Sequence, residues 1–149
     1  ATLFAVLCHD LGKGDTAAED LPRHHGHERA GVPHVERLAA RWPGLADQRA
    51  TMLARTVASL HLDVRRFDEM RTATLAKLYD RHFRAQDFPL EPFALAVGAD
   101  VGGRLGHEQA GVAECERVRR DLEWLRRVAG SVDARALRAL HGDDLEAFR

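Results

Sequence analysis

The 149-residue sequence predicts an all-α domain. Apolar residues recur at spacings of three and four through most of the chain, which is the period of an amphipathic helix. No stretch of useful length alternates apolar and polar residues as a half-buried strand does. Proline and glycine stand between the periodic segments, where helices are expected to end. We therefore expect a bundle of about six to seven helices.

The composition is that of an ordinary globular domain. The chain is 45% apolar and 30% charged, and no stretch approaches the roughly 20 apolar residues of a membrane span, so we exclude a membrane-spanning role. Cys8 and Cys115 are far apart and are expected to be reduced residues of a cytoplasmic protein. Because the formal net charge is −1, any contact with RNA must be local.

The first helix is expected over residues 1–11. It is apolar nearly all round, which is typical of a buried helix. Gly12 is well placed to end it as the C′ residue. His9 and Asp10 would then lie in its last turn, where the negative end of the helix dipole favours a nearby cation.

Residues 14–26 contain a cluster of histidines and no periodicity, so they are interpreted as a functional loop. A second helix is predicted over about residues 30–42. Pro33 is compatible with that helix if it lies in the first turn. Pro43 and Gly44 end the helix.

Three further helices follow at the same period. The third continues from Leu45 and ends near His61, and the fourth is capped by Thr72 and runs to His82. The fifth has Pro92 in its first turn.

The fifth helix places an acidic residue on an apolar face. Phe93, Ala96, Asp100 and Arg104 follow one stripe. A carboxylate on a buried face is costly unless a cation pairs with it. Two partners are available for Asp100, namely Arg104 and a metal ion.

The sixth helix is predicted over about residues 112–128, and a last helical segment over residues 133–148. Trp42 and Trp124 lie on helical stripes and are interpreted as core residues.

His9, Asp10 and Asp100 together suggest a metal site. One imidazole and two carboxylates are a reasonable ligand set for a divalent first-row metal or magnesium. Such an ion would lower the pKa of bound water and polarise a phosphoryl oxygen. Lys13 could hold or neutralise a phosphate.

Three segments extend this interpretation: residues 8–14 (CHDLGKG), residues 22–32 (PRHHGHERAGV) and residues 99–106 (ADVGGRLG). In this order they resemble the HD domain of bacterial multifunctional CCA proteins, which are tRNA nucleotidyltransferases whose C-terminal half is a phosphohydrolase of the HD superfamily. The resemblance covers most of the chain.

The resemblance implies a helical HD fold and metal-dependent hydrolysis of 2′,3′-cyclic phosphodiesters, 2′-nucleotides and other phosphomonoesters. It assigns metal ligation to His9, Asp10 and Asp100. The divalent ion is expected to be Mg, Mn, Ni or Co. His9, Asp10 and Lys13 are the expected catalytic residues, and small nucleotides or RNA 3′ ends are the expected substrates.

The same resemblance implies parts that this sequence does not contain. A nucleotidyltransferase head and a further histidine ligand would lie upstream. We therefore interpret residues 1–149 as a single HD domain, clipped at both ends. CCA addition and tRNA binding are expected of the longer parent.

Three residues are expected to bind substrate. His27 opens the second helix, whose free N–H groups favour anions. His61, at a helix end, is a candidate for phosphate or a second metal, and a structural role is about as well supported. Arg104 would brace Asp100 or bind the substrate. As a cluster, His24, His25 and His27 could also contribute to a second metal, bind the substrate phosphate or belong to a polar loop.

A second function from a different class is a non-catalytic tail that positions tRNA. It would use an arginine-lined groove on the sixth helix, formed by Arg117, Arg119, Arg120, Arg126 and Arg127. A third interpretation keeps the HD fold and changes the substrate to deoxynucleoside phosphates or a cyclic dinucleotide.

Overall fold

The computed structural model of the chain describes residues 1–131. In that range helices alternate with turns and loops and no strand occurs, which confirms the predicted all-α class. The α-helices are α1 (Thr2–Cys8), α2 (His27–Arg41), α3 (Gln48–Leu60), α4 (Thr72–His82), α5 (Leu90–Gly102) and α6 (Glu108–Ser131). Three 3₁₀ helices stand between them, η1 (Leu11–Asp15), η2 (Ala18–Asp20) and η3 (Val64–Glu69). The segment predicted over residues 133–148 lies outside the described residues. Within residues 1–131, no helix is both long and apolar enough to cross a membrane.

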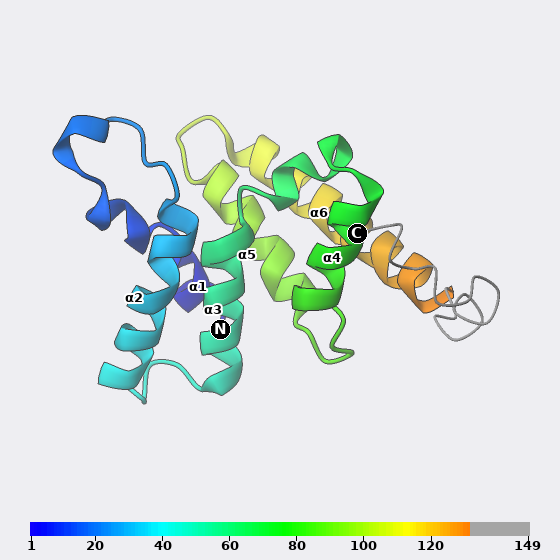
Figure 1. Ribbon diagram of the computed structural model, residues 1–149, viewed down its shortest axis with the longest axis horizontal. Helices are drawn as coiled ribbons and strands as arrows, with labels where there is room; N and C mark the ends of the chain where they lie inside the picture. Colours follow the sequence, from blue (N-terminus) through cyan, green and yellow to red (C-terminus); the bar gives the residue numbers. More distant parts are fainter. Residues whose placement is uncertain (132–149) are drawn as a thin grey trace, which may run out of the picture.

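The core lies between α3, α5 and α6. In Figure 1, α2 and α4 lie towards opposite sides of the molecule, with α3 and α5 between them. α1 packs against both α3 and α5, α2 packs against α3 and η1, and α6 runs along α5. The largest fully buried side chains include Phe93 on α5, Leu53 on α3 and Leu122 on α6. Because α1 contacts both α3 and α5, His9 and Asp10, which follow α1, are held close to the C-terminal end of α3.

α1 is buried on one side rather than all round. Phe4, Ala5 and Cys8 are buried, whereas Leu3 is 86% exposed and Leu7 is 67% exposed. The predicted burial of the whole helix is therefore wrong. The reason is that α1 packs against α3 and α5 through its buried residues, and in the described part of the chain no helix covers the face of Leu3 and Leu7.

Gly12 has a different role from the predicted one. α1 already ends at Cys8, with His9 as its capping residue, and Gly12 lies buried inside η1. A Cβ at Gly12 would collide with the carbonyl oxygen of His27 and lie 2.5 Å from the backbone nitrogen of Gly31. The absence of a side chain thus lets η1 press directly against the first turns of α2, and this contact brings Asp10 next to His27.

α2 begins three residues before the predicted start. Its first residue is His27, and Gly26 precedes it with a left-handed φ of 75°. Pro33 therefore lies beyond the first turn, and its predicted position is wrong. Thr72 is also misplaced by the prediction, because it is the first residue of α4 and Arg71 occupies the capping position.

Both tryptophans are about half exposed, so their interpretation as core residues is wrong. Trp42 is the residue at which α2 ends, and Trp124 is on the outer face of α6. A stripe of apolar residues on a helix overstates burial when no second layer of helices covers that stripe.

Gly12→Ala is expected to lower the free energy of unfolding by about 1–3 kcal/mol, because the added methyl group meets backbone atoms that cannot rotate away. Gly14→Ala is the matched control in the same 3₁₀ helix, since nothing lies within 4 Å of its Cβ position. Urea unfolding followed by circular dichroism measures both. Equal effects of the two substitutions would contradict the proposed contact.

Candidate metal centre

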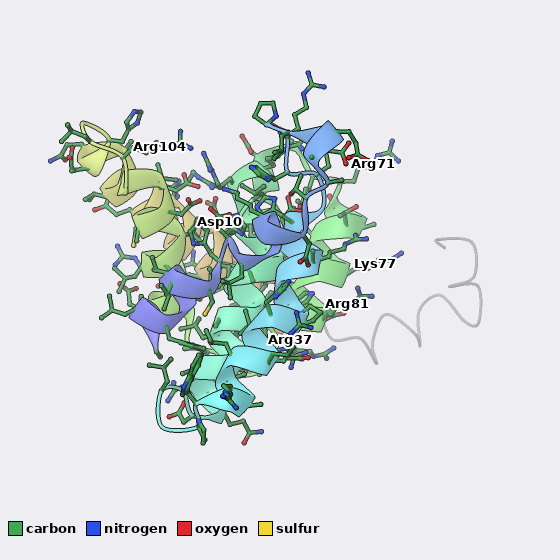
Figure 2. All side chains as sticks on the ribbon, turned by 90° about the vertical axis from the view of Figure 1, so that its left-hand side faces the viewer. Asp10, Arg37, Arg71, Lys77, Arg81 and Arg104 are labelled. Carbon is green, nitrogen blue, oxygen red and sulfur yellow. The ribbon has the colours of Figure 1, made fainter. Side chains whose placement is uncertain are left out.

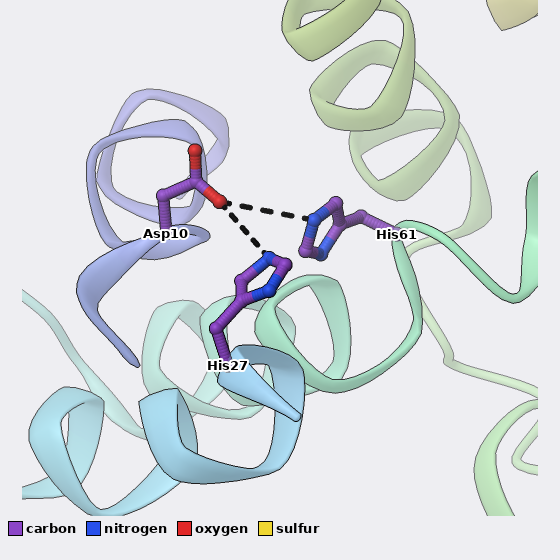
Figure 3. A group of neighbouring side chains, drawn as sticks. All are labelled: Asp10, His27 and His61. Carbon is purple, nitrogen blue, oxygen red and sulfur yellow. Dashed lines mark ion pairs between the residues drawn. The ribbon is translucent and has the colours of Figure 1, made fainter. Parts of the chain in front are cut away.

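Four polar side chains converge where α1 ends. His9 and Asp10 follow α1 directly, His27 is the first residue of α2, and His61 is the residue at which α3 ends. Figure 3 shows the carboxylate of Asp10 pointing between the rings of His27 and His61. Each group is thus placed by a helix terminus, where the backbone fixes the direction of the side chain.

One oxygen of Asp10 faces two imidazoles. Asp10 Oδ1 lies 3.2 Å from His27 Nε2 and 3.9 Å from His61 Nε2. Both histidines are buried, and Asp10 is partly buried. The three residues offer ligand atoms that all lie within 4.8 Å of one another. This is the spacing of groups that share one bound ion.

The ring nitrogens on the other side are all held by backbone carbonyls. Nδ1 of His27 donates to the carbonyl of His24 at 2.7 Å, and Nδ1 of His61 lies 3.1 Å from that of Val57. Nδ1 of His9 donates to the carbonyl of Val6 at 2.6 Å. A proton fixed on Nδ1 leaves Nε2 as the nitrogen that can bind a metal, which is the usual orientation of metal-binding histidines.

A divalent cation fits this donor set. Asp10 Oδ1 and His27 Nε2 are buried and have no hydrogen-bond partner within residues 1–131. Leaving such an atom unpaired costs about 1–3 kcal/mol. When His27 is neutral, the lone pair of its Nε2 faces the lone pairs of a carboxylate, and a cation between them removes this repulsion. Two imidazoles and a carboxylate suit several divalent first-row metals.

The second oxygen of Asp10 belongs to a different set of contacts. Asp10 Oδ2 accepts a hydrogen bond from Lys13 Nζ at 2.5 Å and lies 3.1 Å from His9 Nε2. His9 Nε2 also lies 3.3 Å from Asp100 Oδ1. Asp10 therefore connects the His27 and His61 side of the site with the His9 and Asp100 side.

The two sides differ in protonation. The hydrogen bond to Asp100 raises the pKa of His9, and the same bond lowers the pKa of Asp100. Burial is the main cause that lowers the pKa of His61, and the nearby charge of His9 adds to it. These shifts favour a charged pair of His9 and Asp100 and a neutral His61, whose Nε2 lies 3.9 Å from Asp10 Oδ1.

The predicted site residues lie partly together. His9, Asp10, Lys13, His27, His61 and Asp100 share one neighbourhood, linked by the contacts given above. The cluster with metal-ligand spacing consists of Asp10, His27 and His61. From the sequence, both histidines are expected to bind substrate, with a second metal as the alternative. The signal available in the sequence was that His27 opens a helix and His61 ends one, and the packing of α2 against α3 and η1 brings these ends together.

Arg104 lies apart from this group. α5 ends at Gly102, so Arg104 is exposed on the following turn rather than on the stripe of Asp100 (Figure 2). Arg104, one of the two partners considered for Asp100, does not pair with it in residues 1–131, because the helix stops before it completes another turn. Arg65 on η3 takes that place, with its Nη1 3.8 Å from Asp100 Oδ2.

His24 fixes the orientation of the His27 ring through its backbone carbonyl. Its carbonyl accepts the hydrogen bond from His27, and its own ring nitrogen Nδ1 lies 2.9 Å from the hydroxyl of Thr16. His25 is exposed and makes no polar contact in the described residues. The histidine loop thus contains one ligand candidate, one supporting residue and one exposed residue.

Three curated proteins with the name multifunctional CCA protein are similar to this chain over most of its length. The one from Alkalilimnicola ehrlichii is 44% identical over 134 residues, the one from Methylococcus capsulatus 42% over 139, and the one from Stenotrophomonas maltophilia 40% over 139. The chain is thus related to part of the multifunctional CCA proteins. The three matches cover 89%, 90% and 93% of this chain.

The similarity concerns one portion of these CCA proteins. The chain spans about a third of their length, with 31%, 31% and 33% of each relative covered. No family model matches the chain, and no solved structure matches it significantly. The relation to CCA proteins therefore rests on sequence identity over most of this chain.

His27→Ala is expected to weaken binding of Mn²⁺ or Ni²⁺ by about 100-fold or more, because it removes a candidate ligand. Loss of a residue that only orients a ligand typically weakens metal binding by about 10- to 100-fold, and loss of the ligand itself should weaken it more. His25→Ala, in the same loop, is the control and should bind like the wild type. Isothermal titration of each protein with the metal alone measures the affinity. Unchanged affinity in His27→Ala would exclude this residue as a ligand.

The stability of the metal-free protein should fall on acidification. Because the pKa of His61 is lowered in the fold, the unfolded chain binds the proton first, and the stability associated with neutral His61 is lost as the pH falls through about 6.5. His61→Gln should reduce this loss, and His25→Gln should not. Urea unfolding in a chelator between about pH 7.5 and 5.5 tests this, and an unaltered pH dependence in His61→Gln would contradict it.

Proposed function

We propose that this chain is a metal-dependent phosphohydrolase of the HD superfamily, acting on 2′,3′-cyclic phosphodiesters, 2′-nucleotides and other phosphomonoesters. The observation that carries the proposal is the buried Asp10 Oδ1, which has no hydrogen-bond partner within residues 1–131 and faces the Nε2 atoms of His27 and His61. The HD resemblance of the surrounding segments supplies the reaction class.

Asp10, His27 and His61 would hold the ion, and the resemblance adds His9 and Asp100 as further ligands on the other side of Asp10. A divalent ion held here lowers the pKa of a bound water and polarises a phosphoryl oxygen. The presence of two sets of donors on the two oxygens of Asp10 supports a site that can hold more than one ion.

The protein groups around Asp10 have separate tasks in this hydrolysis. The hydroxyl group of a water would add to phosphorus while the ester P–O bond breaks, and the proton that this water gives up would go to the departing ribose oxygen. Asp10 would orient the attacking water through Oδ2 as well as bind the ion through Oδ1. Lys13, whose Nζ lies beside Oδ2, would offset the negative charge that grows on the phosphoryl oxygens.

In the longer relatives this activity would stand beside tRNA nucleotidyl transfer. Their name, multifunctional CCA protein, supports the presence of a second activity. We propose tRNA as the partner of the whole protein, and RNA 3′ ends or small nucleotides with a 2′,3′-cyclic phosphate as substrates of this portion.

The alternative of a tRNA-positioning tail has less support. Arg117, the first arginine of the proposed groove on α6, turns towards η3 and donates to the carbonyl of Val64 at 3.0 Å. It also binds Glu114 and Asp121, and Arg120 lies 3.6 Å from Asp121. These acidic partners reduce the charge that α6 could offer to an RNA backbone.

Asp10→Ala and His9→Ala are expected to lower hydrolysis of 2′,3′-cyclic AMP by more than about 100-fold, because both change the groups that hold the ion and the water. Asp87→Ala is the control, since Asp87 is exposed and makes no polar contact in the described part of the chain. Turnover is measured with Mg²⁺, Mn²⁺, Co²⁺ and Ni²⁺ in turn.

Two results would overturn the proposal. One is a wild-type protein that binds metal and leaves both the cyclic nucleotide and a 2′-nucleotide intact. The other is full activity in Asp10→Ala. Binding of tRNA that weakens steeply with salt, with neither metal nor turnover, would favour the tRNA-positioning tail instead.

A further inference from the structure

Arg65 lies at the rim of the metal centre. It is the second residue of η3 and follows His61 by four positions, so the same chain segment supplies both. Its Nη1 is 3.8 Å from Asp100 Oδ2, and its side chain is 42% exposed. A guanidinium group with this placement contacts the site on one side and solvent on the other.

The donors of Arg65 are free for a ligand. Its guanidinium makes no hydrogen bond within residues 1–131, and its distance to Asp100 is longer than a hydrogen bond. The neighbouring Arg66 differs, because its Nε donates to Glu69 at 2.8 Å. The polar contact of the Arg65 guanidinium in residues 1–131 is thus the ion pair with Asp100, and its planar set of N–H groups remains available to bind two oxygens of a phosphate.

The charge of Arg65 affects how strongly the site attracts a phosphate. Asp10 is paired with Lys13, and Asp100 contacts His9 through Oδ1 and presents its Oδ2 towards Arg65. The exposed guanidinium of Arg65 is thus a positive charge at the rim that an approaching phosphate can meet. Its attraction to a phosphate at a given distance doubles when the phosphate carries two charges instead of one.

We propose that Arg65 binds the phosphate oxygens of the substrate and favours the doubly charged phosphate of a monoester over the singly charged phosphate of a cyclic diester. The inference rests on the proposed phosphohydrolase function and adds a preference within it. A phosphomonoester carries about −1.5 to −2 charges near pH 7, whereas a diester carries one. The centre would thus act chiefly as a 2′-nucleotidase and phosphomonoesterase, and Arg65 would be the residue that favours binding of the doubly charged phosphate.

The test compares one monoester and one cyclic diester in the same metal-loaded protein. Arg65→Ala is expected to lower kcat/KM for 2′-AMP by about 10- to 100-fold, chiefly through KM, and that for 2′,3′-cyclic AMP by less than about 5-fold. Arg65→Lys should restore part of the monoester activity, since it keeps the charge and loses the two-pronged contact. Arg66→Ala is the matched control and should change neither.

Binding of inorganic phosphate separates this inference from the proposed function. Isothermal titration of the metal-loaded protein with inorganic phosphate should show about 10-fold or greater weakening in Arg65→Ala. If this weakening is found in a protein without turnover, the phosphohydrolase proposal fails and the role of Arg65 stands. If turnover is found and Arg65→Ala affects both substrates equally or neither, the role of Arg65 is excluded and the phosphohydrolase proposal stands.

Discussion

The close contact between η1 and the start of α2 is the constraint on which the site depends. Gly12 allows the two backbones to touch, and a side chain there would collide with the His27 carbonyl. The contact holds Asp10 beside His27, and the packing of α1 against α3 brings His61 to the same point. The position of the candidate metal site therefore depends on backbone contacts between helices, and the side-chain rotamers only adjust the final distances.

The sequence could predict the elements and the centre of the site. Helical periodicity found the helices because each has an apolar stripe, and His9-Asp10 stood out as polar residues at the end of an apolar run. The full donor set was harder to find, since His27 and His61 are 34 positions apart and meet only through the packing of α2 on α3. The exposure of Leu3, Leu7 and both tryptophans could not be predicted, because periodicity reports an apolar face and not what covers it.

Asp100 pairs with Arg65 rather than with Arg104, and the sequence could not predict this because the pair joins two separate elements. Asp100 and Arg104 would lie on the same face only if the helix continued through both residues, but α5 ends at Gly102. Once the helix has ended, Arg104 has no fixed direction relative to Asp100, and a residue from η3 can reach the carboxylate instead. The spacing of residues along the sequence thus predicts which side chains share a face of one helix. Charged pairs between two elements depend also on where each element ends.

The hydrogen bonds at Nδ1 of His9, His27 and His61 have an entropic consequence. Each ring is already fixed by a backbone carbonyl, so a ligand that binds at Nε2 would restrict few additional side-chain rotations. The loss of rotamer freedom occurs when the domain folds, and it does not reduce the affinity of the site. A rigid arrangement of this kind discriminates between ions by size and preferred geometry, because the donors cannot move far to accommodate an ion that fits poorly.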